Sequence, residues 1–448
     1  MEFKQPILIA LLAALPWAPV HAAKTQYSVS GDHADGIYAE GETAVFQVKR
    51  EEAAIGQSAE YRIWQNRWDT ITTQPLDAQL AEENINFSPD GNGWYRCSIR
   101  LPEVRRPAAE SGIVVAPEKF QPSMPAPEDF DAFWTAQKER LAASPATPII
   151  TPLTPEQFKL EAKNPDHRKK IERIAEKGFT YANVEIPCLD VQPVRGYYCA
   201  PKDAARGSTP AIILFHAAGV KGGWCRSSLV QALSMAEKYN AIVIDINAHG
   251  MLNGQPQAYY DDLEKGELKN YRHQGNQSRD DFYFLGMFLR LMRAIDFLCA
   301  QPEWDGQHLL AYGISQGGGQ VLAAAGLDHR VSGAVAIVPA LCDISGNVAG
   351  WPGLGNAKAG TPEAEAIANT MRYFDAVNFN ARSQADTLMA VGLIDTTCPP
   401  PGVYAAYNQL DTPKRIISAP DQGHHQMSIP NSQLRREYEN FIKEQLKK

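Results

Sequence analysis

The chain has 448 residues, of which 44% are hydrophobic and 21% are charged, and its formal net charge is −8 at pH 7. This composition is that of a globular protein long enough for two or three domains, and it excludes a fibrous or an intrinsically disordered chain. The negative charge argues against a nucleic-acid partner, because such binding depends on Lys and Arg side chains that neutralise phosphates, and it favours a neutral or weakly charged substrate.

Residues 1–22 have the pattern of a secretory signal peptide. A lone Lys4 precedes an apolar segment at residues 7–15, and the small residues Ala22 and Ala23 suit a cleavage site. The apolar segment is too short to span a bilayer, and no later run of about 20 apolar residues follows it. No cysteine directly follows the segment, which argues against a lipoprotein anchor. We therefore predict a protein without a membrane span that is periplasmic or secreted.

Residues 23–112 have the pattern of a small all-β domain. Short stretches in which apolar and polar residues alternate, such as residues 44–49 and 93–99, are separated by Gly, Asp and Asn. Such strands with frequent turns are typical of an immunoglobulin-like β-sandwich. A stretch rich in Pro and Ala predicts a linker over residues 113–127, so that residues 128–448 form the second, catalytic domain.

Strands and helices alternate in this second domain. The predicted strands are a pair within residues 179–198 and apolar runs at residues 210–216, 241–245, 309–312, 331–338, 387–393 and 415–419. The predicted helices include residues 128–141, 227–239 and 281–299, and residues 247–279 form a loop-rich insert. This alternation predicts a mostly parallel sheet covered on both faces, which is the arrangement of the α/β-hydrolase fold.

The motif Gly-x-Ser-x-Gly, centred on Ser315, lies between the predicted strand at residues 309–312 and a run of small residues at 321–325 that suits a tightly packed helix. Gly313 and Gly317 are needed because side chains there would collide with the neighbouring strand and helix. This is the context of a nucleophile elbow, which raises a serine hydroxyl above the edge of the sheet. A Gly-rich turn that holds a serine by chance is the alternative, and the flanking strand and helix favour catalysis.

A serine hydroxyl needs a general base, and the base needs an acid that orients it. In this fold the acid and then the base follow the serine along the chain. The acid is predicted to be Asp395, at the end of a predicted strand, with Asp343 and Asp386 as alternatives. The base is predicted to be His424, in the loop after the last strand, with its neighbour His425 as the alternative.

Two backbone N–H groups are candidates for the oxyanion hole. One belongs to Gln316, which directly follows the predicted nucleophile. The other belongs to Ala218, in the loop after a predicted strand, with Ala217 as the alternative. His216, at the end of that strand, is interpreted as a packed, hydrogen-bonded residue rather than a proton shuttle.

Several residues are candidates for lining the substrate pocket. They are His216, Trp224, Asn247, His249, Tyr259 and Tyr260. Flat aromatic faces suit a sugar ring or a small acyl group, and core or surface packing is the alternative for the three aromatic residues. A structural turn is the alternative for Asn247 and His249.

The seven cysteines show no regular spacing and no C-x-x-C pair. We therefore predict no metal site, and the expected chemistry requires no cofactor. Export permits disulfides, and Cys188 and Cys199 lie on two predicted arms of a hairpin. Buried free thiols are favoured for most of the cysteines.

Three longer motifs carry a family resemblance. They are Gly313-Ile314-Ser315-Gln316-Gly317-Gly318, then Gly392-Leu393-Ile394-Asp395-Thr396-Thr397-Cys398-Pro399-Pro400 with Ala405-Ala406-Tyr407-Asn408, and Phe130-Asp131-Ala132-Phe133-Trp134. Through them, residues 117–446 resemble the acetyl xylan esterase and cephalosporin C deacetylase family, carbohydrate esterase family seven. The resemblance implies a triad of Ser315, Asp395 and His424, with oxyanion donors at Gln316 and Ala218.

The chain departs from the usual family pattern at three places. It has Asn247-Ala248-His249 where members usually carry Arg-Gly-Gln, His216-Ala217-Ala218 where they carry His-Gly-Tyr, and His424-His425 where they carry His-Glu. These differences concern the wall of the acyl pocket and leave the triad complete.

We therefore predict a secreted serine carboxylesterase that removes acetyl groups from xylan fragments or related acetylated carbohydrates through an acyl-enzyme intermediate. A serine peptidase of the same fold is one alternative, although the segment before the linker is too short for a propeller domain. A catalytically silent carbohydrate-binding protein is the other, which the complete set of Ser, Asp and His argues against. The sandwich is compatible with glycan binding, with an interface in a homo-oligomer, or with a spacer.

Overall fold

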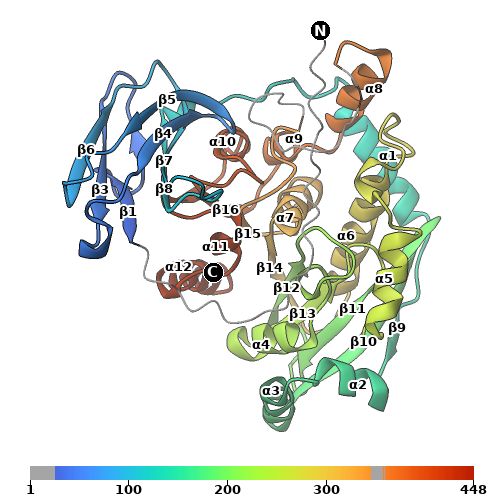
Figure 1. Ribbon diagram of the computed structural model, residues 1–448. Coiled ribbons are helices and arrows are strands. Elements are labelled where there is room, and N and C mark those ends of the chain that lie inside the picture. The colour runs from blue at the N-terminus through green and yellow to red at the C-terminus, as the bar shows by residue number, and fades with distance from the viewer. Residues whose placement is uncertain (1–25, 345–356, 358, 448) are drawn as a thin grey trace.

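The computed structural model describes residues 26–344, 357 and 359–447 (Figure 1). The predicted signal peptide at residues 1–22 lies outside the described residues. Within these ranges, no helix is long and apolar enough to cross a lipid bilayer.

The N-terminal β-region, residues 26–116, contains two sheets (Figure 1). In the described chain a three-stranded sheet has the order β1-β3-β6, and a five-stranded sheet has the order β2-β8-β7-β4-β5. The elements are β1 (Tyr27–Gly31), β2 (Ile37–Tyr38), β3 (Ala44–Arg50), the 3-10 helix η1 (Glu52–Ala54), β4 (Glu60–Gln65), β5 (Asp69–Pro75), β6 (Glu82–Phe87), β7 (Gly93–Arg100) and β8 (Ala109–Val115). Inward side chains of both sheets, among them Phe46 and Ile63, share one core. The prediction of a small antiparallel β-region ahead of an α/β sheet is confirmed.

Regular structure continues past the predicted start of the linker at residue 113. Strand β8 ends at Val115, and the 3-10 helix η2 (Pro117–Lys119) follows it. The division of the chain into domains at these residues stays a prediction.

The second region is built on a mostly parallel sheet. Within the described residues its nine strands have the order β17-β16-β15-β14-β12-β13-β11-β10-β9. The strands are β9 (Ile149–Thr151), β10 (Phe179–Cys188), β11 (Val191–Pro201), β12 (Thr209–Phe215), β13 (Ile242–Ile246), β14 (Trp304–Ile314), β15 (Gly333–Ile337), β16 (Asp386–Gly392) and β17 (Lys414–Ala419). Strands β12 to β17 pair in parallel, whereas β9, β10 and β11 form an antiparallel edge. The predicted α/β-hydrolase architecture is confirmed.

Helices cover both faces of this sheet. They are α1 (Phe130–Ala142), α2 (Pro155–Glu161), α3 (Pro165–Glu176), α4 (Leu229–Tyr239), α5 (Gln257–Lys265), α6 (Tyr283–Cys299), α7 (Gln316–Leu327), α8 (Pro362–Met371), α9 (Ala376–Asn380), α10 (Pro400–Asn408), α11 (His424–Ser428) and α12 (Ser432–Gln445), with the 3-10 helices η3 (Gly223–Cys225) and η4 (Tyr271–His273). The insert at residues 247–279, predicted to be loop-rich, contains α5 and η4. It therefore has more regular structure than its sequence predicted.

Successive residues of a central strand point into two different cores. Ile213 of β12 belongs to the core that contains α6 and α7, whereas Ile212 and Leu214 belong to the core that contains α4 and α12. This follows from the period of two along a strand, and it explains why the central strands read as continuous apolar runs.

The N-terminal β-region packs directly on the carboxyl ends of two strands of the large sheet. The indole Nε1–H of Trp94 in β7 donates to the backbone oxygen of Leu393, at 2.6 Å. The N–H of Gly112 in β8 donates to the oxygen of Pro420, at 2.8 Å. A Cβ at residue 112 would lie 2.0 Å from the Leu393 oxygen, so only glycine permits this approach. The β-region thus supports the two loops that follow β16 and β17.

A Trp94→Phe substitution tests this interface. It removes the indole N–H that the buried Leu393 carbonyl accepts and part of the buried ring volume, so we expect the unfolding free energy to fall by about 1–3 kcal/mol. Urea denaturation measures this change. Trp64→Phe is a control that removes an indole hydrogen bond to Ser98 inside the β-region. An unchanged unfolding free energy in Trp94→Phe would show that the contact does not stabilise the interface.

Candidate active site

Ser315 occupies a strained turn between β14 and α7. Its φ is 59° and its ψ is −120°, a conformation that non-glycine residues rarely adopt. A Cβ at Gly313 would lie 2.4 Å from the oxygen of Gly317, and a Cβ at Gly317 would lie 2.5 Å from the oxygen of Phe215. Both glycines are therefore required by close packing, as the elbow motif predicts.

The imidazole of His424 lies between Ser315 and Asp395. Its Nε2 is 3.0 Å from the Ser315 Oγ, and its Nδ1 is 2.7 Å from the Asp395 Oδ2. The serine is 6% exposed and the aspartate is fully buried. The carboxylate accepts the Nδ1–H, which leaves Nε2 free to take a proton from the hydroxyl. The three residues predicted from chain order are thus brought together.

The second oxygen of Asp395 holds the carboxylate in place. Asp395 Oδ1 accepts the backbone N–H groups of Thr397, at 2.7 Å, and Cys398, at 2.9 Å. Of the alternative acids, Asp343 accepts from the N–H and hydroxyl of Ser123, and Asp386 accepts from Gln445. The carboxylate of Asp395 is the one that contacts His424.

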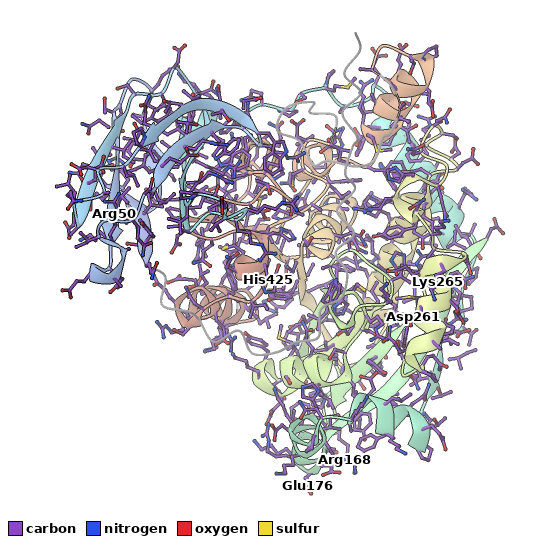
Figure 2. All side chains as sticks on the ribbon, viewed as in Figure 1. Arg50, Arg168, Glu176, Asp261, Lys265 and His425 are labelled. Carbon is purple, nitrogen blue, oxygen red and sulfur yellow. The ribbon has the colours of Figure 1, made fainter. Side chains whose placement is uncertain are left out.

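His424 begins a short helix instead of lying in the predicted loop. The N–H of Gly423 donates to the side-chain oxygen of Gln426, at 3.2 Å, which caps helix α11 at its first turn. His425, labelled in Figure 2, is the second residue of α11 and is exposed. The two neighbouring histidines therefore differ sharply in their surroundings.

The two predicted oxyanion donors lie on segments that Tyr271 joins. Gln316 is the first residue of α7, where backbone N–H groups have no partner within the helix. The Tyr271 hydroxyl donates to the Gln316 Oε1, at 2.7 Å, and accepts the N–H of Gly219, the residue after Ala218, at 3.4 Å. Sequence reasoning missed Tyr271, because it lies in the insert and no motif marks it.

His249 holds the same loop from the other side. Burial lowers the pKa of its imidazole to about 3, so the ring is neutral. Its Nε2–H donates to the Gly219 oxygen, at 2.9 Å, and its Nδ1 accepts from the Tyr283 hydroxyl, at 2.8 Å. The ring also packs edge-on against Tyr271, with ring centroids 4.4 Å apart. His249 therefore positions the loop through both ring nitrogens.

His216, a further pocket candidate, bonds to a buried carboxylate on the neighbouring strand. His216 is buried and contacts the buried carboxylate of Asp245, which also accepts the N–H of Ser228, at 3.1 Å. Burial raises the pKa of Asp245, and His216 opposes that shift. His216 is thus a hydrogen-bonded residue at the end of its strand, as the sequence interpretation expected.

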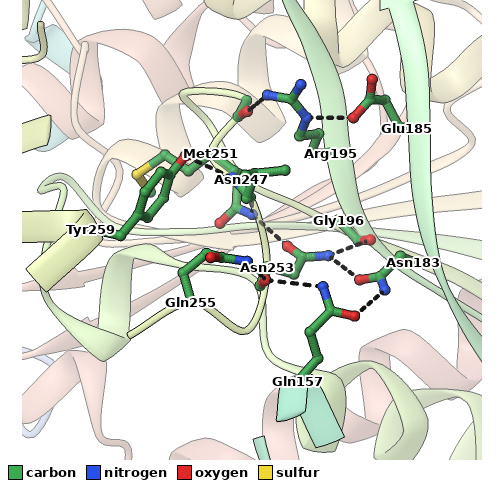
Figure 3. Close-up of polar contacts among 12 residues, drawn as sticks. Gln157, Asn183, Glu185, Arg195, Gly196, Asn247, Met251, Asn253, Gln255 and Tyr259 are labelled. Atoms are coloured by element: carbon green, nitrogen blue, oxygen red, sulfur yellow. Dashed lines mark hydrogen bonds and ion pairs between the residues drawn. The ribbon is translucent and has the colours of Figure 1, made fainter. Parts of the chain in front are cut away.

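Asn247 lies in a network of side-chain amides (Figure 3). It accepts the N–H of Ser227, at 2.9 Å, and donates to the Met251 oxygen, at 2.9 Å, and the Asn253 Oδ1, at 2.6 Å. Asn253 continues the network through Asn183 and the Gly196 oxygen (Figure 3). Asn247 therefore fixes a turn, which was the alternative to a pocket role.

The aromatic candidates divide into two kinds. The hydroxyls of Tyr259 and Tyr260 bond to the N–H and the oxygen of Leu252, at 3.2 and 2.9 Å, and pack α5 on the preceding turn. Trp224, by contrast, is 63% exposed, and its Nε1–H donates to the Ala218 oxygen, at 3.3 Å. Trp224 presents an aromatic face beside a predicted oxyanion donor.

Cys398 lies against the triad. Among the described residues, its sulfur and ligand atoms of Asp395 and His424 lie within 4.8 Å of one another. Both ring nitrogens of His424 and both oxygens of Asp395 already form hydrogen bonds, so a metal ion would have to displace them. Burial raises the pKa of the Cys398 thiol well above its usual value. All seven cysteines are described, and each is a free thiol.

Comparison with known proteins decides the family. A family model described as acetyl xylan esterase (AXE1) matches residues 117–443. The chain belongs to the acetyl xylan esterase family. The esterase is accordingly a carboxylic ester hydrolase, and the resemblance inferred from its motifs is confirmed.

Individual relatives agree with this assignment. The esterase is 26% identical over 415 residues to the acetyl esterase Axe7A of Xylanibacter ruminicola. The alignment covers 89% of this chain and 87% of Axe7A. The acetyl xylan esterase from Paenibacillus sp. R4 has a TM-score of 0.57 and 26% identity, covering 74% of this chain and 98% of its own. Acetyl xylan esterase 1 from Thermoanaerobacterium sp. JW/SL YS485, with a TM-score of 0.56 and 22% identity, covers 73% of this chain and 97% of its own, and shows the same fold.

The buried His249 makes stability depend on pH. Its pKa of about 3 lies below the value of about 6.5 in an unfolded chain, so the unfolded state binds the proton first as pH falls. This contribution is complete above about pH 6.5 and is lost progressively toward pH 3. We expect His249→Gln, which cannot titrate, to lose less unfolding free energy than the wild type between pH 7 and pH 5. Urea denaturation at both pH values measures this, and equal losses would contradict the assignment.

Proposed function

We propose that the esterase removes acetyl groups from xylan fragments or related acetylated carbohydrates, with Ser315 as nucleophile and an acyl-enzyme intermediate. The observation that carries this proposal is the continuous hydrogen-bonded path from Asp395 through His424 to the Ser315 hydroxyl. A serine hydroxyl is a weak nucleophile at neutral pH, and such a path is the means by which proteins activate one.

The proposed reaction has two halves. In the first, Ser315 Oγ attacks the acetyl carbonyl carbon while His424 Nε2 takes the hydroxyl proton, and Asp395 stabilises the resulting imidazolium. The tetrahedral intermediate collapses as the C–O bond to the sugar breaks and His424 returns the proton to the leaving sugar oxygen. In the second half, His424 takes a proton from a water molecule as the water oxygen attacks the acetyl-serine carbonyl carbon. The second intermediate collapses as the bond to Ser315 Oγ breaks, His424 returns the proton to that oxygen, and acetic acid leaves and ionises to acetate.

The negative oxygen of each tetrahedral intermediate would be held by the N–H groups of Gln316 and Ala218. One such donor is typically worth about 3–4 kcal/mol of transition-state stabilisation. Backbone donors depend on the positions of their loops rather than on their side chains. Tyr271 and His249 bond to the segments that carry them, and we assign both residues a positioning role.

The substrate class is proposed from family and surface chemistry together. The relatives named above are acetyl esterases and acetyl xylan esterases. A neutral acetylated sugar suits a protein with a net charge of −8 better than a polyanion does. The exposed face of Trp224 beside Ala218 can pack on the apolar face of a sugar ring. The pattern of residues 1–22 supports export to the periplasm or beyond, where such polysaccharide fragments occur.

The two adjacent histidines provide a matched test of this proposal. We expect Ser315→Ala and His424→Ala to lower kcat for release of acetate from p-nitrophenyl acetate by at least about 10³-fold, because removing either member breaks the triad. The control His425→Ala, one residue away and exposed, should retain wild-type turnover.

Two results would contradict the proposal. Turnover in Ser315→Ala equal to the wild type would remove Ser315 as nucleophile, and loss in His425→Ala with retention in His424→Ala would reassign the base. The substrate class is tested by release of acetate from acetylated xylo-oligosaccharides. Cleavage of peptide amides without release of acetate would instead establish a serine peptidase.

A further inference from the structure

The turn between β4 and β5, residues 66–68, is tied to the loop that carries Asp395. The N–H of Asn66 donates to the Trp94 backbone oxygen, at 2.9 Å. The indole N–H of the same Trp94 donates to the oxygen of Leu393, two residues before Asp395, at 2.6 Å. Trp94 therefore connects the turn of the N-terminal β-region to the loop of the proposed catalytic acid.

Electrostatics place the turn beside the triad as well. Burial lowers the pKa of the Arg67 guanidinium, and the acidic groups of Cys398 and Asp395 oppose this shift. The charge of Arg67, in turn, lowers the pKa of the Cys398 thiol, opposing the rise that burial causes. The charges of Arg67 and Asp395 therefore interact, which agrees with the hydrogen bonds that tie the turn to the loop of Asp395.

The side chain of Arg96 in β7 holds the turn in place through several contacts. This buried side chain is ion-paired with Glu110, at 2.7 Å, and it donates to the backbone oxygens of Asn66 and Arg67. Its guanidinium carbon also lies 5.1 Å from the ring centroid of Trp94 and 5.8 Å from that of Trp68. The orientation of the turn is therefore fixed by charge, hydrogen bonds and cation–π contacts at once.

Trp68 is the residue that this support presents to solvent. Its ring meets Trp64 edge-on, with centroids 6.4 Å apart, yet the residue is 67% exposed. A lone exposed aromatic residue is common on protein surfaces, so exposure alone does not indicate a role. Trp68 differs because Arg96 and Trp64 orient its ring and because its turn is bonded through Trp94 to the loop of Asp395. It resembles the anchors of binding surfaces, which present a rigid ring at little entropic cost.

We propose that Trp68 forms a carbohydrate-binding subsite of the active site, on which a xylose unit of the substrate chain stacks beside the unit that loses its acetyl group. The inference rests on the proposed function of Ser315. It assigns to the N-terminal β-region a direct part in substrate binding, in addition to its support of the loops after β16 and β17.

The positions of two exposed tryptophans favour an oligosaccharide over a single sugar. Trp224 donates to the oxygen of Ala218, which carries a proposed oxyanion donor, whereas Trp68 belongs to the turn that is bonded through Trp94 to the loop of Asp395. We expect a chain of sugars that passes the nucleophile to contact both rings, and a single acetylated sugar to contact at most one of them. The structural matches to the two solved esterases cover nearly all of each of those chains but only about three quarters of this one. The family model begins at residue 117, so a subsite on the N-terminal β-region lies outside the part of the chain that this model matches.

The experiment compares long and short substrates in Trp68→Ala. On acetylated xylohexaose we expect kcat/KM to fall about tenfold, mainly through a higher KM, because stacking contributes to binding in the ground and transition states alike. On p-nitrophenyl acetate and on acetylated xylose, which do not reach Trp68, we expect less than a twofold change. Trp68→Phe should recover most of the loss. The control is Ile71→Ala on β5 of the same hairpin, where a side chain that is 46% exposed is removed.

Each contrary result has a definite meaning. Wild-type kcat/KM on the hexasaccharide in Trp68→Ala would overturn the subsite. An equal loss on long and short substrates would also overturn it, because it would indicate a structural role for Trp68. If the wild type itself releases no acetate from acetylated xylose oligomers, the proposed substrate fails and the subsite fails with it. That outcome is recognised in the wild type before any variant is compared.

Discussion

The two hydrogen bonds of the His424 imidazole are the constraint on which the candidate active site depends. They join a turn after β14, a loop after β16 and a short helix after β17, three segments that lie far apart in the chain. The carboxyl ends of parallel strands meet at one edge of a sheet, so the fold brings these segments together without long loops. The strained backbone of Ser315 and the buried carboxylate of Asp395 both lie at that edge.

The segments around this contact are held by polar groups that take no part in the proposed chemistry. Tyr271 and His249 bond to the two segments that carry the proposed oxyanion donors, and Trp94 bonds to the loop before Asp395. Buried polar groups of this kind fix geometry because an unpaired donor or acceptor is costly to bury. The N-terminal β-region is therefore part of the support of the site, since its Trp94 and Gly112 contact the loops of the proposed acid and base.

Local patterns allowed much of the fold and the triad to be predicted. The apolar strands, the elbow at Ser315 and the chain order of Asp395 and His424 depend on neighbouring residues and on the fold class alone. The remaining features depend on contacts between distant residues, such as Tyr271 with Gln316 and Trp94 with Leu393, for which a single sequence carries no signal. Asn247 has the composition of a pocket residue, yet its amide is used within a turn.

The central claim is that His424 and Asp395 make Ser315 the one activated nucleophile of this esterase. Labelling of the wild-type protein with a fluorophosphonate, followed by peptide mapping by mass spectrometry, tests this most directly, because such probes react with an activated serine. We expect one adduct per chain, on the peptide that contains Ser315, together with complete loss of acetate release. An adduct on a different residue, or an active enzyme that remains unlabelled at Ser315, would contradict the account.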